Sequence, residues 1–370
     1  MILVASFPSL LLSLLLAVLT VDAQCIEPSV RREWRTLTTD EKAAWISAVK
    51  CLGSSPHNPN LTATVDPSIS LIPAMNSSGS FWDDISYMHM DLNVKIHQTG
   101  MFLPFHRWFV HSIEQAMIEK CGYSASAGFP YWNWTIDAPD FYEASWWQDS
   151  DPVSGLGGWG DPEQDYEVQD GAFAGFELSY PVYHKLRHQF TLQPFAAFAN
   201  SSPIIAQFFN SSTINTVANS TFHADQIAAI IVGNAGDYVG FQQSLDGWIG
   251  AHGAVHAATG GDLAGTCPAA AEDCIPGNKW SPNSPLFFLH HAMIDKIWSD
   301  WQNLNETSAT AFYGGSVEAF DNVTYFYEYP NGAPPMLNTS YQIYTDNMFP
   351  GATIGDVLNT TAGFLCYVYE

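Results

Sequence analysis

The chain has 370 residues, of which 47% are hydrophobic and 14% aromatic, so it can bury a large core and is not a disordered protein. Acidic residues outnumber basic ones 37 to 12, and the formal net charge of −25 argues against nucleic acids and anionic membranes as partners. A globular enzyme or binding protein remains.

The first residues read as a targeting segment. Leu10 to Leu19 form an apolar run, and Val21-Asp22-Ala23 ends it with small residues of the kind found at a signal-peptidase site. The run is too short to span a membrane, and no other long apolar run follows. We therefore expect residues 1–23 to be a signal peptide, and residues 24–370 to form one secreted, soluble domain.

Cysteines and glycosylation sequons agree with secretion. All six cysteines follow residue 23, and an even number in a secreted chain favours disulfides. Fifteen pairings are possible; those we expect are Cys25–Cys366, Cys51–Cys121 and Cys267–Cys274. We expect N-glycans on some of the Asn-X-Ser/Thr sequons, which are at Asn60, Asn76, Asn133, Asn200, Asn210, Asn219, Asn305, Asn322, Asn338 and Asn359.

The first half of the chain predicts three helices. Residues 38–41 read Thr-Thr-Asp-Glu, which is typical of a capping box, and predict a helix to about Cys51. Residues 53–80 are rich in Pro, Ser and Asn and indicate a long loop. A second helix is expected over 81–95, and a third has Pro104 in its first turn and runs to about residue 121.

The second half alternates long loops with helices. Residues 122–181 are aromatic and loop-like, residues 182–222 are mixed, and residues 258–285 form a loop rich in Gly and Pro. The last 65 residues suggest short strands and turns. Helices are expected over 223–233, over 238–257, and from Pro285 through Trp301. The predicted fold is mainly α, with a four-helix bundle core that carries a metal site, long loops and a few short β-strands.

Histidines gather in two clusters. His89, His97 and His106 are spaced eight and nine residues apart, and far downstream His252 and His256 are four apart, on one face of a helix. The His290-His291 pair can supply the third histidine ligand of the second cluster. This pattern predicts two metals, each held by three imidazoles. The carboxylate patterns of catalytic zinc and of di-iron bundles are missing, so a copper pair is favoured.

Two segments carry a family resemblance. Residues 97–114 contain Phe-Leu-Pro and Phe-His-Arg and resemble the copper-A signature of tyrosinases and catechol oxidases. Residues 284–295 resemble the copper-B signature, although they begin with Ser284 where the family usually has Asp. Residues 31–35, 130–132 and 367–369 also resemble the family core. By this likeness residues 24–370 form a single tyrosinase-like catalytic domain of the short fungal type, without a C-terminal shielding domain.

The resemblance implies the ligands and the chemistry. Copper A would be held by His89, His97 and His106, and copper B by His252, His256 and His291. His290 would be a neighbour rather than a ligand. The cofactor would be two copper ions that bind O2 as a bridging peroxide, and the substrates would be phenols. Glu114 and Asp295 are expected to orient the ligands or the neighbouring Arg107 and Lys296.

Residues around copper B bear on the subtype. In the family an acid before the first copper-B ligand holds a water that takes the phenol proton, and an Asn after that ligand helps align it. Here the acid is the shorter Asp246, and Gly253 replaces the Asn. We therefore predict oxidation of o-diphenols to o-quinones by Asp246-assisted chemistry, and expect Gly253, Ala257 and Asn278 to contact the substrate.

Three other functions fit parts of the same sequence pattern. The alternatives are a full tyrosinase that also hydroxylates monophenols, a hemocyanin-like O2 carrier, and a secreted glycoprotein without chemistry. Giant carriers differ from this short chain, which is expected to act as a monomer. His184 and His188 are also four apart, but Lys185 and Arg187 between them favour a solvated face over a second metal site. Hydrophobic walls around the coppers are expected from Phe102, Phe105 and Phe287.

Overall fold

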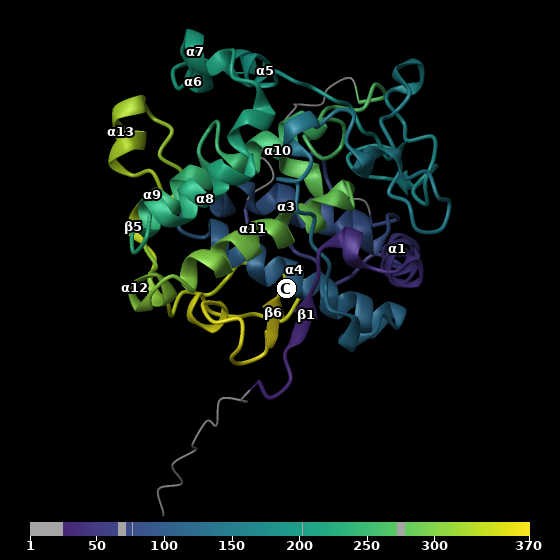
Figure 1. The fold of residues 1–370 in the computed structure, drawn as a ribbon, viewed down its shortest axis with the longest axis horizontal. Helices are drawn as coiled ribbons and strands as arrows, with labels where there is room; N and C mark the ends of the chain where they lie inside the picture. The colour runs from purple at the N-terminus through teal and green to yellow at the C-terminus, as the bar shows by residue number, and fades with distance from the viewer. Residues whose placement is uncertain (1–24, 66–71, 76, 202, 272–277) are drawn as a thin grey trace, which may run out of the picture.

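The computed structural model describes residues 25–65, 72–75, 77–201, 203–271 and 278–370, and helices dominate it (Figure 1). The α-helices are α1 Thr39–Ser54, α3 Phe81–Ile96, α4 Phe102–Cys121, α5 Phe195–Ser201, α6 Pro203–Ala206, α7 Ser211–Ile214, α8 Ala224–Gly233, α9 Tyr238–Asp246, α10 Ala251–Thr259, α11 Leu286–Gln302, α12 Glu306–Thr310 and α13 Val323–Glu328. Three two-stranded sheets pair β1 Ser29–Arg31 with β6 Tyr367–Tyr369, β2 Glu177–Leu178 with β3 His184–Lys185, and β4 Gly315–Val317 with β5 Ala333–Met336.

The core is the predicted four-helix bundle. Helices α3, α4, α10 and α11 lie together at the centre of Figure 1, and each carries at least one of the expected ligand histidines. Local sequence starts these helices: the Ser80 side chain accepts a hydrogen bond from the Asp83 amide, and Asp83 accepts one from Ser80 in return. Helix α4 ends at Gly122, whose φ of 69° is the left-handed conformation that glycine tolerates best. The mainly α prediction is confirmed.

The single helix predicted over 238–257 is wrong. The chain forms α9, breaks at residues 247–250, and starts again as α10. A side chain at Gly250 would lie 2.3 Å from the Leu245 carbonyl oxygen, so only glycine permits this close turn. Because of this break, His252 and His256 lie on a separate helix, and its axis need not continue that of α9.

The last 65 residues contain more helix than predicted. Helices α12 and α13 lie among the expected strands and turns. The Asn305 side chain accepts a hydrogen bond from the Ser308 amide, and Asn322 does the same for the Tyr325 amide, so each asparagine caps a short helix. These caps were readable in the sequence, because Asn stands directly before each helix.

Disulfides follow the expected pairing where it can be seen. Cys25 is bonded to Cys366 and Cys51 to Cys121, which confirms two of the three predicted pairs. Cys267 is disulfide-bonded as well, whereas its expected partner Cys274 lies outside the described residues. The expected signal peptide also lies outside them.

A buried charged cluster joins both ends of the chain to the bundle. Arg31 of β1 pairs with Glu114 of α4 at 2.9 Å and with Asp295 of α11 at 3.2 Å, and Arg107 pairs with Asp295 from the other side. All four side chains are at most 5% exposed. The prediction that Asp295 orients Arg107 is confirmed, but Lys296 pairs with Asp300 instead.

Strand β6 completes this cluster. The hydroxyls of Tyr367 and Tyr369 each donate to Asp295 Oδ2 at 2.5 Å. The Arg31 guanidinium lies 3.5 Å from the centre of the Tyr367 ring, a cation–π contact. Strands β1 and β6 run in parallel, with Val30 opposite Val368, and lie side by side in Figure 1.

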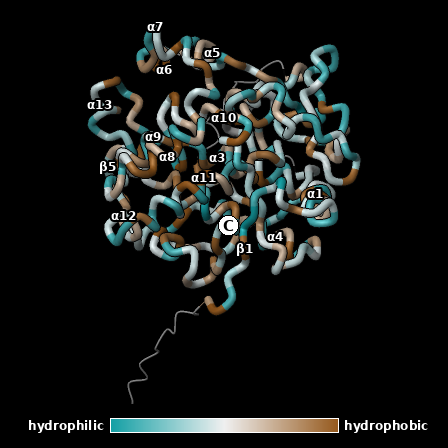
Figure 2. The backbone as a smooth tube through the Cα atoms, viewed as in Figure 1, coloured by the Kyte–Doolittle hydropathy of each residue, from teal (hydrophilic) through white to brown (hydrophobic). Residues whose placement is uncertain are grey.

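Hydrophobic and hydrophilic stretches are interspersed along the whole backbone rather than gathered at one end (Figure 2). Among the described residues, every helix is too short or too polar to cross a bilayer.

Candidate metal centre

The first three histidines converge as predicted. His89 comes from the middle of α3, His97 caps the end of the same helix, and His106 lies in the second turn of α4. Their possible ligand nitrogens all lie within 4.8 Å of one another. The ring centres of His97 and His106 are 5.1 Å apart, and those of His89 and His97 are 5.0 Å apart. One metal ion can therefore reach all three.

The second cluster forms between α10 and α11. His252 and His256 lie one turn apart on α10, and His290 and His291 enter from α11. Their nitrogens also lie within 4.8 Å of one another, and His256 Nε2 is 3.4 Å from His291 Nε2. This cluster offers a second three-imidazole site, with His290 beside it.

The two clusters face each other. The rings of His106 and His291 stack at 4.2 Å between centres with 12° between their planes. The rings of His97 and His252 lie nearly parallel at 5.9 Å. The two metal positions are thus neighbours, as a site needs when it handles one small molecule between two ions.

Hydrogen bonds to backbone carbonyls occupy Nδ1 of His106 and of His256 and leave Nε2 of these two rings for a metal. His106 Nδ1 donates to the Phe102 carbonyl at 2.8 Å, and His256 Nδ1 donates to the Leu263 carbonyl at 2.6 Å. Nε2 of His106 and Nε2 of His252 are buried and have no hydrogen-bond partner among the described residues. Buried polar atoms rarely stay unpaired, and a carbonyl on the opposite nitrogen is the usual way to aim an imidazole at a metal. The residues therefore fit two copper ions.

Electrostatics keep these rings in the ligand form. Burial, helped by the charge of His256, lowers the pKa of His97 to about 3. Burial likewise lowers the pKa of His256 to about 4, and the pKa values of His106, His252 and His291 lie well below the ordinary range. Metal binding needs the neutral imidazole, so no proton competes strongly for the site near neutral pH.

His290 is fully buried beside the second cluster. Its ring is fully buried, 5.5 Å from the His252 ring and 4.7 Å from the His256 ring, and both its nitrogens lack a hydrogen-bond partner among the described residues. That it is a neighbour and not a ligand remains a prediction.

The expected aromatic wall is confirmed. Phe287 lies 4.2 Å from the His291 ring and 5.1 Å from the His89 ring, so it touches both clusters. Phe102 lies 4.8 Å from the His252 ring, and Phe105 5.2 Å from the His106 ring. None of the three phenylalanines is exposed, so water reaches the centre only from other directions.

Asp246 lies at the junction of the two halves. Its Oδ2 accepts a hydrogen bond from the Gln98 amide at 2.6 Å, and its Oδ1 is 3.6 Å from His252 Nδ1. Burial raises the pKa of Asp246 well above its usual value. The carboxylate therefore contacts both a copper-B histidine and the residue that follows His97.

The expected substrate contacts differ in exposure. Gly253 is half-buried, and a side chain built there would meet nothing within 4 Å, so it borders open space. Ala257 is 3% exposed, one turn further along α10. Asn278 begins a 3-10 turn, Asn278–Asn283, and its side chain is outside the described part. Gly253 is thus the expected contact residue that faces an opening.

The solvated face expected around His184 and His188 is wrong. His184 belongs to strand β3, not a helix, and His184, Arg187 and His188 are at most 7% exposed. Asp262 binds both His184 and Arg187, which is why the positive charges can be buried. His188 Nδ1 donates a hydrogen bond to the Gly158 carbonyl at 3.0 Å, and neither His184 nor His188 belongs to a group of possible metal ligands among the described residues.

Several residues that shape the centre carried no recognisable signal. Gln98 adopts a φ of 50° and ties α3 to Asp246, although nothing in its sequence context marks it. The carbonyls of Phe102 and Leu263, which orient two ligands, belong to the backbone and are invisible to motif reasoning. Asn93, four residues before His97, contacts His97 Nδ1 at 3.0 Å and could have been found by helical spacing.

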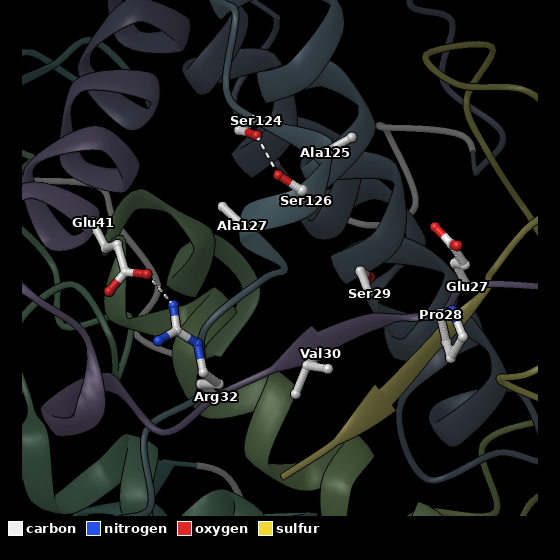
Figure 3. A pocket seen from close by; sticks show the side chains of 10 residues that line it. All are labelled: Glu27, Pro28, Ser29, Val30, Arg32, Glu41, Ser124, Ala125, Ser126 and Ala127. Atoms are coloured by element: carbon white, nitrogen blue, oxygen red, sulfur yellow. Dashed lines mark hydrogen bonds and ion pairs between the residues drawn. The ribbon is translucent and has the colours of Figure 1, made fainter.

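A surface cavity lies away from these histidines. It is lined by β1 and the turn after α4, including Arg32, Glu41 and Ser124, and none of its lining residues is a histidine (Figure 3). Arg32 is paired with Glu41 there. This cavity therefore plays no part in the metal centre.

Comparisons with known proteins agree with this geometry. The model of the common central domain of tyrosinase matches residues 79–304. An N-acetyl-6-hydroxytryptophan oxidase from Emericella nidulans is 29% identical, over 92% of this chain and 92% of its own length. A tyrosinase-like protein from Diaporthe leptostromiformis is 28% identical, over 94% of this chain and 81% of its own. The structure of a polyphenol oxidase from Thermothelomyces thermophila superposes with a TM-score of 0.62 at 25% identity, covering 93% of this chain and 89% of that one. The chain therefore belongs to the tyrosinase family and is a copper-dependent oxidoreductase of the polyphenol oxidase type, with a two-copper cofactor.

Proposed function

We propose that this protein is a secreted polyphenol oxidase that oxidises o-diphenols to o-quinones with O2. The observation that carries the proposal is the pair of three-imidazole clusters that face each other across stacked rings of His106 and His291. A bound copper pair supplies two-electron redox chemistry between the phenol and O2. The protein supplies the geometry, the neutral ligands and the dry wall.

The least buried residues of the metal centre indicate the side from which a substrate can enter. His97 and Gly253 are half-buried, whereas His89, Phe287 and His291 are fully buried. A phenol would therefore approach over Gly253, with its hydroxyls toward the two clusters. Phe287, which is buried against rings of both clusters, keeps water from the reacting atoms.

Two features support diphenol oxidation over monophenol hydroxylation. Oδ2 of Asp246 already accepts a hydrogen bond from the Gln98 amide, and Oδ1 lies 3.6 Å from His252 Nδ1. In contrast to the proton-accepting role expected from the sequence, this carboxylate is therefore better placed to orient a ligand than to take a phenol proton. Gly253 has no side chain to hold a water or the substrate. A catechol carries two adjacent hydroxyls and depends less on such a base. The alternative is a full tyrosinase, which the names of several relatives suggest.

The relatives also widen the range of phenols worth testing. One is named for N-acetyl-6-hydroxytryptophan, a hydroxyindole. The open space beside Gly253 has room for a substituent on the ring. We propose that aryl groups larger than a simple catechol are accepted.

Secretion is supported by the disulfides, which persist in oxidising compartments. Exposed sequons at Asn60, Asn210 and Asn322 are accessible to glycosylation.

Oxygen uptake by the copper-loaded protein tests the function. We expect turnover of 4-tert-butylcatechol, and little or none of tyrosol; N-acetyl-6-hydroxytryptophan extends the panel. Rapid tyrosol turnover after a lag would indicate a full tyrosinase. Reversible O2 binding without quinone would indicate a carrier. The His89→Ala variant, which removes one copper-A ligand, is the control and should be inactive.

A further inference from the structure

A buried ion cluster lies outside the metal centre and is built on Asp262, three residues after the end of α10. The Arg187 guanidinium donates to Asp262 Oδ1 from Nη2 at 2.9 Å and from Nε at 3.2 Å, and His184 Nε2 lies 3.1 Å from the same oxygen. The Arg187 amide donates to Asp262 Oδ2 at 2.8 Å. One carboxylate thus holds a guanidinium, an imidazole and a backbone amide.

Burial makes this cluster sensitive to the loss of any one partner. Asp262 is not exposed at all, Arg187 is 1% exposed and His184 7%. Burial alone would raise the pKa of Asp262, but His184 and Arg187 outweigh it and hold the pKa below its usual value. An ionised carboxylate this deeply buried needs all of its partners, because an unpaired charge there is costly.

The cluster is next to a carbonyl that orients a ligand. Leu263 follows Asp262, and its carbonyl oxygen accepts the hydrogen bond from His256 Nδ1 at 2.6 Å. That bond leaves His256 Nε2 to face His291. The position of the Leu263 carbonyl therefore decides where His256 points.

The segment that follows β3 and contains Arg187 also shapes the turn between α10 and Leu263. The Gln189 amide donates to the Thr259 carbonyl at 3.0 Å, and the Asp262 amide donates to the Arg187 carbonyl at 3.2 Å. Gly261 has a φ of 53°, and a side chain there would lie 2.2 Å from the Arg187 carbonyl oxygen. The turn is therefore packed against the Arg187 backbone and hydrogen-bonded to it, which restricts its conformation.

Arg187 closes the other end of the same turn. Its Nη1 donates to the Cys267 carbonyl at 3.1 Å, and its Nη2 donates to the Thr266 carbonyl. Residues 262–267, which include Leu263, are thus held by Arg187 at both ends.

We propose that Asp262, held by Arg187 and His184, is a positioning residue for copper B. It fixes the Leu263 carbonyl, which holds the His256 ring with Nε2 toward the metal. The inference rests on the proposed function only in that the second cluster binds copper. Outer partners of this kind change metal affinity by roughly 10- to 100-fold when they are lost.

Copper retention by Asp262→Asn in the full-length chain tests the proposal. Wild-type and variant protein are loaded with copper, dialysed against graded chelator, and assayed for copper per chain and for the EPR signal of an isolated Cu(II). We expect one of the two coppers to be held about 10- to 100-fold more weakly, the other to be unchanged, and an EPR signal to grow as the pair is broken. Glu167→Gln is the matched control. The Glu167 backbone forms a β-bridge with Arg187, which the substitution keeps, and its carboxylate pairs with Lys185 rather than with Asp262 or Arg187.

The outcomes separate the proposal from its alternatives. Two coppers held as tightly as in wild type would overturn it, and so would equal loss of both, which indicates general loosening. If Asp262→Asn does not fold, His184→Gln removes one partner of Asp262 and keeps Arg187; it should weaken the same copper a few-fold, and no change would overturn the proposal. Wild-type protein that binds no copper would instead refute the proposed function, whatever the variants do.

Discussion

The buried charged cluster around Asp295 makes the sharpest stability prediction. Asp295 is 1% exposed and is paired with Arg31 and Arg107, while Glu114 is the other carboxylate in the cluster. Two positive and two negative groups therefore cancel. The Asp295→Asn variant keeps the shape of the side chain and leaves one buried positive charge unbalanced.

The size of the effect follows from that imbalance. Breaking a buried ion pair by removing one partner costs about 3 to 5 kcal/mol. Roughly 2.1 cal/mol/K of unfolding entropy per residue, over about 340 residues, gives ~0.7 kcal/mol/K. Dividing one by the other, we expect the Tm to fall by about 4 to 7 °C.

The assay is thermal unfolding of the copper-free protein at pH 7, so that metal binding by His291 on the same helix does not contribute. Asp300→Asn is the control. Asp300 forms a partly exposed pair with Lys296 further along α11, and surface pairs contribute about 0 to 1 kcal/mol. An Asp295→Asn protein that melts within about 1 °C of wild type, or no lower than the control, would refute the reasoning.

The pH dependence carries a definite sign. Burial alone would raise the pKa of Asp295, but Arg107 and Arg31 hold it below its usual value. A carboxylate with a lowered pKa stabilises the fold above the ordinary Asp value and loses that contribution as pH falls through the folded value. The difference between wild type and Asp295→Asn should therefore persist at pH 5 and shrink only below about pH 4.

Three further predictions concern the site and its frame. Gly253→Asn fills open space and supplies the missing polar partner, so the ratio of tyrosol to 4-tert-butylcatechol turnover should rise in oxygen-uptake assays, and an unchanged ratio would contradict our account of the subtype. His290→Ala should retain two coppers by metal analysis, whereas His291→Ala should retain one; loss of copper from His290→Ala would make His290 a ligand. Replacing Cys51 and Cys121 by Ala opens a 70-residue loop and should cost about 4 kcal/mol in denaturant unfolding; a loss under about 1 kcal/mol would mean that the unfolded chain is restrained in another way.

The ligand set could be predicted because helices encode it locally. His252 and His256 share one face of a helix by spacing alone. His89, His97 and His106 lie on two consecutive helices and at the end of the first, among apolar residues that are buried with them. The turn at residues 247–250 did not spoil this prediction, since both histidines lie on the same side of it. Sequence patterns thus predict a ligand where its spacing from another ligand on the same helix is enough to place it.

What escaped prediction depends on partners that are distant in sequence. Arg187 and His184 look solvated until Asp262, 75 residues away, is placed beside them. Gln98 and Asp246 are 148 residues apart, and neither has a motif that announces the other. Charged and polar residues read as surface residues by default, and only the folded chain shows which of them are neutralised in the core.

The pairing of β1 with β6 also sets an order of events during folding. Ser29 meets Tyr367 across a separation that covers nearly the whole chain, and closing so large a loop is entropically slow. Until β1 and β6 pair, Asp295 of α11 lacks its partners Arg31, Tyr367 and Tyr369. Helices α3 and α4 are joined by a short turn and can associate before that pairing. Assembly of the first half of the centre should thus run ahead of the second. We expect His89, His97 and His106 to come together while the position of His291 is still variable. The pairing of β6 with β1 would then be the last step that stabilises α11.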